Sequence, residues 1–261
     1  MATAKLIGGT LAGLGGFWAV AQLTALGVNR GLKSSPPESN NLPSEMDRKD
    51  LFSKLASTWD ATVRWDEFTS GINRWRKQLV SRAQGHVLEV AVGTGRNLEY
   101  YNQKRVDSIT AIDFSRKMLE VVLEKKDNGS IKLGIPLKLK VGNCSNLSDF
   151  EDNQFDSVVD TFGICSFEDP LSALKEMRRV CNADGLILLL EHGESDWPFM
   201  QGLLSNQVNV HVKKFGCYNH RPIEEIVQEA GLKIISQKRK HWGTIYFYVC
   251  SPNKNLSLDL R

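Results

Sequence analysis

The spacing of apolar residues changes near His86. From Asp47 to Val80 apolar side chains recur every three or four positions, which predicts helices that cover a sheet. Beyond His86 short apolar runs alternate with helical stretches, a pattern typical of a parallel sheet built from βαβ units. The predicted strands are Val87–Ala91, Ser108–Asp113, Leu137–Val141, Ser157–Asp160, Leu186–Glu191, Leu232–Gln237 and Thr244–Cys250. The pattern therefore predicts an α/β domain with a seven-stranded, mostly parallel sheet and helices on both faces.

Two helices between the strands have recognisable boundaries. Ser115 can cap a helix that runs through Met118 and Val122. A second helix is expected over Leu171–Cys181, ending before the Asp-Gly pair at 184 and 185.

The amino-terminal segment has a different pattern. No residue from Leu6 to Asn29 is charged, and a helix of that length, at about 1.5 Å per residue, is long enough to cross a bilayer. Its leucines are diluted by Gly8, Gly9, Gly13, Gly15, Gly16 and Gln22. We therefore predict a single transmembrane helix within a membrane anchor at residues 1–30, with a removed targeting segment and a buried soluble helix as alternatives.

A linker separates this anchor from the domain. Residues 31–46 carry three of the eight prolines and almost no apolar side chain, which predicts an extended tether. The catalytic domain is expected at residues 47–251, followed by a tail at 252–261.

Composition and charge exclude several classes of protein. The apolar fraction of 41% suits a folded core. A net charge of +3 is too small to indicate a nucleic-acid partner. The five cysteines form no CxxC pair, so a disulfide framework is not expected.

The first predicted strand leads into a glycine turn and then, we expect, a helix. Gly93 and Gly95 allow a ligand to approach the backbone, as in Rossmann-like folds. Leu98 stands where a dinucleotide-binding fingerprint needs a third glycine, which disfavours a nicotinamide cofactor. Glu89, four residues before Gly93, suits the charged amino acid end of a cationic ligand. Asp113 ends the second strand, where an acidic side chain can accept both ribose hydroxyls.

Three segments carry a family resemblance. Glu89–Leu98, Ala111–Leu119 and Phe155–Phe167 resemble the class I S-adenosylmethionine-dependent methyltransferases. Arg178–Gly193 and Lys214–Arg221 are similar to a fungal mitochondrial inner-membrane methyltransferase-like family, whose membrane-anchored animal relatives include alkyl-thiol methyltransferases. The resemblance implies S-adenosyl-L-methionine as cofactor. The cofactor-binding residues that it implies are Glu89, Ala91, Gly93, Thr94, Gly95, Asn97, Asp113, Phe114, Met118, Asn143, Cys144, Thr161 and Phe162.

One motif departs from the superfamily pattern. Asn143 stands where an acidic residue often contacts the adenine amino group, and its amide oxygen can accept the same hydrogen bond.

Candidate proton acceptors follow two strands. Asp160 ends the fourth predicted strand and His192 follows the fifth, so we expect both near the transferable methyl group. Methyl transfer depends mainly on positioning, and a base adds only about 10²–10⁴-fold. Both assignments compete with a structural role for these side chains.

The segment between the fifth and sixth strands is expected to cover the acceptor. Phe215–Arg221 mixes aromatic and polar residues, which suits a lid. His211, Cys217 and His220 have irregular spacing and no second Cys/His pair nearby, so no metal site is predicted.

The sequence thus predicts a methyltransferase that acts on a small or lipophilic acceptor beside a membrane. The resemblance implies the mitochondrial inner membrane, with the endoplasmic reticulum or another membrane as the alternative location. The alternative function is a cofactor-binding assembly factor for a mitochondrial complex, in which turnover is dispensable. The acceptor, the side of the membrane and the oligomeric state remain open.

Overall fold

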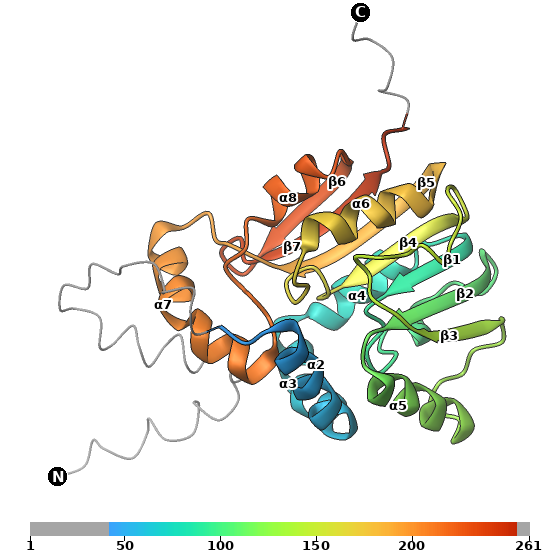
Figure 1. Ribbon diagram of the computed structural model, residues 1–261, viewed down its shortest axis with the longest axis horizontal. Helices are drawn as coiled ribbons and strands as arrows, with labels where there is room; N and C mark the ends of the chain where they lie inside the picture. Colours follow the sequence, from blue (N-terminus) through green and yellow to red (C-terminus); the bar gives the residue numbers. More distant parts are fainter. Residues whose placement is uncertain (1–41, 255–261) are drawn as a thin grey trace, which may run out of the picture.

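The computed structural model describes residues 42–254, which form one seven-stranded sheet with helices around it (Figure 1). The strands are β1 (Gly85–Val90), β2 (Val106–Asp113), β3 (Leu137–Val141), β4 (Phe155–Thr161), β5 (Cys181–His192), β6 (Lys233–Lys240) and β7 (Ile245–Ser251). Their order is β3-β2-β1-β4-β5-β7-β6. All seven predicted strands are confirmed, and the order reverses between β1 and β4, where ligands bind in open α/β sheets.

One strand of the sheet runs against the others. β7 pairs antiparallel with both β5 and β6, while the remaining pairs are parallel. Only four residues, 241 to 244, connect β6 to β7, and a connection this short permits only antiparallel pairing. His241 and Trp242 in this turn have φ values of 53° and 56°. The sheet is therefore mostly parallel, as predicted.

Alternating side chains build a core on each face of the sheet. Leu88 and Leu189 belong to one buried cluster, and their neighbours Val87 and Leu188 belong to the other. Helices α6 (Pro170–Val180) and α8 (Ile223–Glu229) contribute to the first cluster, while α4 (Ile72–Val80) and α5 (Arg116–Asp127) contribute to the second. Strands buried on both faces explain the near-continuous apolar runs in the sequence.

Three further helices gather at one end of the sheet (Figure 1). They are α2 (Glu45–Leu55), α3 (Trp59–Ser70) and α7 (Pro198–Phe215). The prediction of helices from Asp47 to Val80 is confirmed, with breaks at the short helix η3 (Ala56–Thr58) and at Gly71, whose φ is 74°. Of these helices, α4 covers the sheet as expected. Helix α7 was not predicted from the sequence.

Local signals account for the helix starts. Ser44 accepts the backbone N–H of Asp47, and the Asp47 side chain accepts the backbone N–H of Ser44, which forms a capping box at α2. Asp169 caps α6 through the backbone N–H of Ser172. Ser115 precedes α5 as predicted, but its hydroxyl contacts the Ser53 hydroxyl at 2.9 Å and does not cap the helix.

The helix expected after the glycine turn is absent. The chain forms only the short 3-10 turn η4 (Leu98–Tyr100) and is extended at Tyr101. The Tyr101 hydroxyl donates to Glu89 at 2.8 Å, so the chain turns inward directly after η4.

The predicted membrane anchor lies outside the described residues, as does most of the linker. Among residues 42–254, none of the helices combines the length and apolar character that a bilayer span requires.

Candidate functional site

A cavity of about 300 Å³ opens at the carboxyl ends of β1, β2, β4 and β5. Helices α2, α3, α4 and α7 contribute to its walls. We name its two parts by their elements. The glycine-loop half comprises the lining residues of 91–94, 113–118, 143–145 and 161–162, and the α7 half comprises Cys165, His192, Trp242 and the lining residues from 200–219.

Gly93 and Gly95 lack a side chain for different structural reasons. Both have positive φ, 54° at Gly93 and 77° at Gly95. A Cβ added to Gly93 would meet nothing within 4 Å, while one on Gly95 would approach a Leu98 methyl carbon to 2.9 Å. Gly93 therefore leaves space open in the cavity wall, and Gly95 allows close packing inside the fold.

Ala91 and Phe162 hold strained backbone at neighbouring strand ends. Their φ values are 49° and 62°, which are unusual for residues with a side chain. Both line the cavity, directly after β1 and β4. Such strain persists only where surrounding packing fixes it, and it is frequent at functional sites.

Asp113 fixes the glycine turn from the second strand. Its carboxylate accepts the backbone N–H groups of Gly93 and Ser115, each at 2.9 Å. The side chain lines the cavity although the residue is only 4% exposed. Burial raises the Asp113 pKa to about 6, opposed by the two backbone hydrogen bonds. The predicted ribose acceptor is thus a preorganised carboxylate in the cavity wall.

Glu89 lies behind the wall and not on it. It is 1% exposed and is absent from the cavity lining. Asn97 donates to one of its oxygens at 2.9 Å, and Tyr101 donates to the other. Burial raises the Glu89 pKa to about 7, although these hydrogen bonds and Arg76 lower it. Glu89 therefore does not reach the cavity surface, contrary to the expectation that this carboxylate faces a ligand.

A charged network that the sequence reasoning missed joins α3 to the glycine turn. Asp60 accepts the Thr94 hydroxyl at 2.6 Å and pairs with Lys125 at 2.7 Å. Glu67 pairs with Arg76 at 2.7 Å and with Arg96 at 2.6 Å. The sequence signal was the seven-residue spacing of Asp60 and Glu67, which places both on one helix face.

Arg76 connects this network to the fourth strand. It donates to the Asn97 amide oxygen at 2.8 Å and to the Thr161 hydroxyl at 2.7 Å. Its guanidinium lies 5.3 Å from the Phe162 ring centroid. Because Arg76 and Glu67 both line the cavity, the wall offers charges of both signs.

The residues predicted to bind the cofactor lie either in the cavity wall or behind it. Residues in the cavity wall are Ala91, Gly93, Thr94, Asp113, Phe114, Met118, Asn143, Cys144, Thr161 and Phe162. Gly95, Asn97 and Glu89 lie behind it. The Asn143 amide oxygen already accepts the Ser145 backbone N–H at 2.9 Å, which leaves it one further acceptor position.

Asp160 is buried beneath the cavity with Glu191. It is fully buried, lies outside the lining, and accepts the Ile164 backbone N–H at 3.0 Å. Burial raises the Asp160 pKa to about 7. Burial also raises the Glu191 pKa well above its usual value, and the neighbouring Asp160 charge raises it further. Asp160 therefore fixes the segment after β4 and does not face a ligand.

His192 lies in the cavity wall at the end of β5. Its ring stacks on Phe162, with centroids 4.3 Å apart. Its Nδ1 atom is 3.7 Å from the Cys217 sulfur. Burial, together with His211 and His241, lowers the His192 pKa to about 3, so the imidazole is neutral at physiological pH.

The α7 half is mainly apolar. Lining residues include Met200, Leu203, Leu204, Val210, Phe215 and Trp242. Phe215, Cys217 and Asn219 of the expected lid contribute to this wall. Arg48, buried on α2, donates to the Tyr218 hydroxyl at 2.8 Å and thereby fixes the same segment.

A sequence profile described as a methyltransferase domain matches residues 88–189. The mitochondrial methyltransferase OMS1 of Saccharomyces cerevisiae is 32% identical over 78% of this chain. The match covers 46% of OMS1, so this chain spans about half the length of that relative.

The match covers a larger share of two bacterial relatives than it does of OMS1. The ubiquinone/menaquinone biosynthesis C-methyltransferase UbiE of Bdellovibrio bacteriovorus is 31% identical over 63% of this chain and 70% of its own length. The phosphatidylethanolamine N-methyltransferase of Cereibacter sphaeroides is 30% identical over 65% of this chain and 81% of its own length.

Solved structures share the fold at low identity. A Leishmania major S-adenosylmethionine-dependent methyltransferase has a TM-score of 0.60 at 13% identity, covering 79% of this chain and 82% of its own. The DhpI–SAH complex has a TM-score of 0.57 at 17% identity, covering 83% of this chain and 100% of its own.

Proposed function

Since this chain belongs to the S-adenosylmethionine-dependent methyltransferases, we propose that it methylates a small or lipophilic acceptor beside a membrane. The observation that carries the proposal is the single cavity that joins the Gly93–Asp113 turn to the apolar α7 half.

The glycine-loop half fits the cofactor of the family. The space beside Gly93 leaves room for a ligand against the backbone, and Asp113 offers carboxylate oxygens to ribose hydroxyls. Arg76 and Glu67 provide opposite charges for the zwitterionic amino acid end. Glu89 supports this arrangement from behind through Asn97. Asn143 and Cys144, on the other side of the turn, are proposed to contact the adenine.

The cofactor supplies an activated methyl group on a sulfonium. The chain has to align an acceptor atom with that methyl group and keep water away, and such positioning is worth about 7–11 kcal/mol of the barrier. Phe162, held at positive φ between Arg76 and His192, is placed to shape this part of the wall. His192 is the proposed proton acceptor, but the proposal does not depend on it, because the positioning effect is the larger one.

The composition of the α7 half favours a lipophilic acceptor. Aliphatic, aromatic and methionine side chains predominate in its lining, together with a few polar groups such as Gln207 and Lys214, and such a surface suits an apolar ligand. Two relatives are named for methylation in quinone biosynthesis and for methylation of phosphatidylethanolamine. A quinone precursor, a thiol or a lipid is therefore the acceptor class that we propose.

The uncharged run from Leu6 to Asn29 supports a membrane location for this activity. The yeast relative is named as mitochondrial. We propose that the full chain is a single-pass protein of the mitochondrial inner membrane, held there by its first 30 residues.

Isotope transfer from methyl-labelled S-adenosylmethionine tests the proposal. The protein is incubated with a mitochondrial membrane extract, and labelled products are separated into lipid, quinone and thiol fractions. We expect one labelled product with the wild type and none with Gly93→Asp. Gly129→Asp is the matched control, because Gly129 also has positive φ and open space but lies in the turn after α5. Equal labelling by all three proteins would contradict the proposal.

Complementation separates enzyme from assembly factor. If Gly93→Asp lost cofactor binding but fully restored a deletion strain, the assembly-factor alternative would replace the proposed activity.

A further inference from the structure

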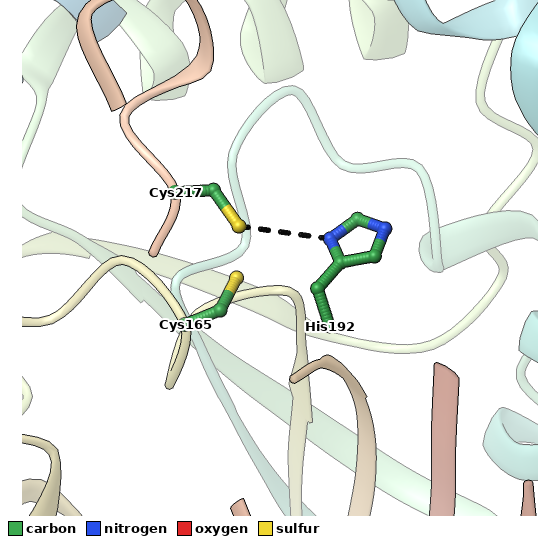
Figure 2. A group of neighbouring side chains, drawn as sticks. All are labelled: Cys165, His192 and Cys217. Carbon is green, nitrogen blue, oxygen red and sulfur yellow. Dashed lines mark hydrogen bonds between the residues drawn. The ribbon is translucent and has the colours of Figure 1, made fainter. Parts of the chain in front are cut away.

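Three side chains with metal-binding atoms meet in the α7 half of the cavity (Figure 2). They are Cys165 from the segment after β4, His192 from the end of β5, and Cys217 from the turn after α7. Their two sulfurs and one ring nitrogen all lie within 4.8 Å of one another. Cys165 is 1% exposed and Cys217 is 6% exposed.

We propose that Cys165, His192 and Cys217 bind a zinc ion whose fourth coordination position opens into the cavity. The ligand chemistry is that of a zinc site with two thiolates and one imidazole, in which an open position is held by water or a substrate atom.

The distances suit tetrahedral coordination. With zinc bonds of about 2.3 Å to sulfur and 2.0–2.1 Å to nitrogen, two such ligands are separated by about 3.6 Å in a tetrahedral site. The Cys217 sulfur lies 3.7 Å from His192 Nδ1, and Figure 2 marks this contact with a dashed line. A point equidistant from three atoms separated by 4.8 Å lies about 2.8 Å from each, so even the widest separation requires movements of only about 0.5–0.8 Å.

The backbone holds the three ligands in place. The Tyr218 N–H donates to the Cys165 carbonyl at 2.7 Å, which joins the two cysteine segments directly. The Cys165 N–H donates to Glu191 at 3.2 Å. The His192 ring stacks on Phe162. These contacts are the supporting shell that a metal site needs.

The charge balance also suits a buried site. Binding converts two thiols to thiolates and releases two protons, and the neutral His192 ring donates its Nδ1 lone pair. The two negative charges offset those of Zn²⁺, so the occupied site is neutral and burial carries little Coulombic penalty.

The open position has a consequence that rests on the proposed function. All three ligands line the cavity that we assign to the acceptor, so the ion would bind an acceptor oxygen or sulfur and lower its pKa. With zinc on Nδ1, His192 acts as a ligand and no longer as a proton acceptor.

Metal content of the purified full chain tests the site. After saturation with Zn²⁺ and exhaustive dialysis, we expect about one zinc per wild-type chain, and less than about a tenth for Cys165→Ala and Cys217→Ala. Cys144→Ala and Cys250→Ala are matched controls that should retain the ion, because Cys144 lines the same cavity outside the triad and Cys250 is buried in β7. Circular dichroism of each variant establishes that it is folded.

Cobalt substitution gives an independent readout that needs no methyl transfer. The Co²⁺ form should show thiolate charge-transfer absorption and tetrahedral visible bands, and added imidazole should shift those bands by occupying the fourth position. Loss of methyl transfer with an intact cobalt spectrum would contradict the proposed function alone. A wild-type chain without zinc, equal zinc in Cys165→Ala, or a Cys165–Cys217 disulfide in place of the ion would overturn the metal site.

Discussion

The two halves of the cavity differ in how their residues are distributed along the chain. The wall of the glycine-loop half around Gly93 and Asp113 comes from one βαβ unit and the strand beside it. The α7 half brings Cys165, His192 and Cys217 together with residues of helix α7 and with Trp242 from the turn between β6 and β7. These segments lie far apart in the sequence. Local chain geometry therefore determines the first half, and long-range packing assembles the second. If the two halves are also functionally separable, a change in one half should leave the other half's ligand unaffected.

Gly93→Asp should have the largest effect, confined to the glycine-loop half. The new side chain enters open cavity space beside the Asp113 carboxylate, so steric and like-charge repulsion both oppose the ligand. We expect S-adenosylmethionine to bind at least about 100-fold more weakly, or about 2.7 kcal/mol, in calorimetric titration. Gly129→Asp should leave the dissociation constant unchanged. An unaffected Gly93→Asp protein would mean that the ligand does not approach this turn.

Asp113 should make cofactor binding depend on pH. Its pKa is raised to about 6 from 3.8, so the carboxylate that accepts ribose hydroxyls is lost as pH falls below about 6. Affinity should weaken roughly tenfold between pH 7 and pH 5, which is about 1.4 kcal/mol. Asp113→Asn should bind more than about tenfold more weakly at pH 7 and lose this dependence. An affinity that stays constant down to pH 5 would exclude Asp113 as the acceptor.

The raised pKa also has a stability consequence of defined sign. The folded state binds the Asp113 proton more tightly than the unfolded state, so this group's contribution to the free energy of unfolding is fully present below pH 3.8 and decreases as pH rises toward about 6. In unfolding titrations, Asp113→Asn should remove this component of the pH dependence. An identical pH profile in the two proteins would contradict the burial of an ionisable carboxyl here.

Val210→Asp should affect the α7 half alone. Val210 lines the cavity and is 67% exposed, so the change adds charge at an apolar wall without disrupting the core. We expect KM for a lipophilic acceptor to rise roughly tenfold, while cofactor affinity stays unchanged. Leu123→Asp, a matched change at a 49% exposed position on α5, should leave both quantities unaltered. A parallel loss of cofactor binding in Val210→Asp would show that the two halves are coupled.

Truncation should have the smallest effect on the folded domain. Deleting residues 1–41 retains the Ser44 cap of α2, whereas deleting residues 1–44 removes it together with Leu42, which packs on α7. Loss of the cap should cost about 1 kcal/mol and lower Tm by about 2–4 °C relative to the shorter deletion. Both proteins should bind the cofactor and lose membrane fractionation.

Alkaline carbonate extraction of the full chain checks the anchor itself. Release of the full-length protein into the supernatant would contradict the anchor, and a mature amino terminus beyond Asn29 would indicate a removable targeting segment.

The sequence predicted features that depend on a few neighbouring residues. Short apolar runs between helical stretches predicted all seven strands, and neighbouring residues such as Val87 and Leu88 pack on opposite faces of the sheet. Gly93 and Asp113 were found because a parallel pair of strands brings the two strand ends to the same sheet edge. The different placement of Glu89 also has a local cause. Its side chain points inward, where Asn97 and Tyr101 donate hydrogen bonds to its two oxygens beneath the cavity wall.

Only the tertiary structure could decide what meets across long separations. No spacing in the sequence places Asp60 over Thr94, or Cys165 beside Cys217, because each pair depends on how a helix docks at the edge of the sheet. His211 and His220, considered with Cys217 from sequence proximity, are not its partners in the proposed zinc site, while Cys165 and His192 are. The sequence by itself determined the strands, the glycine turn and its acidic partner, since these follow from backbone periodicity and residue size. Packing of α3 and α7 determined the charged network and the α7 half, since contacts between distant segments exist only once the sheet is assembled.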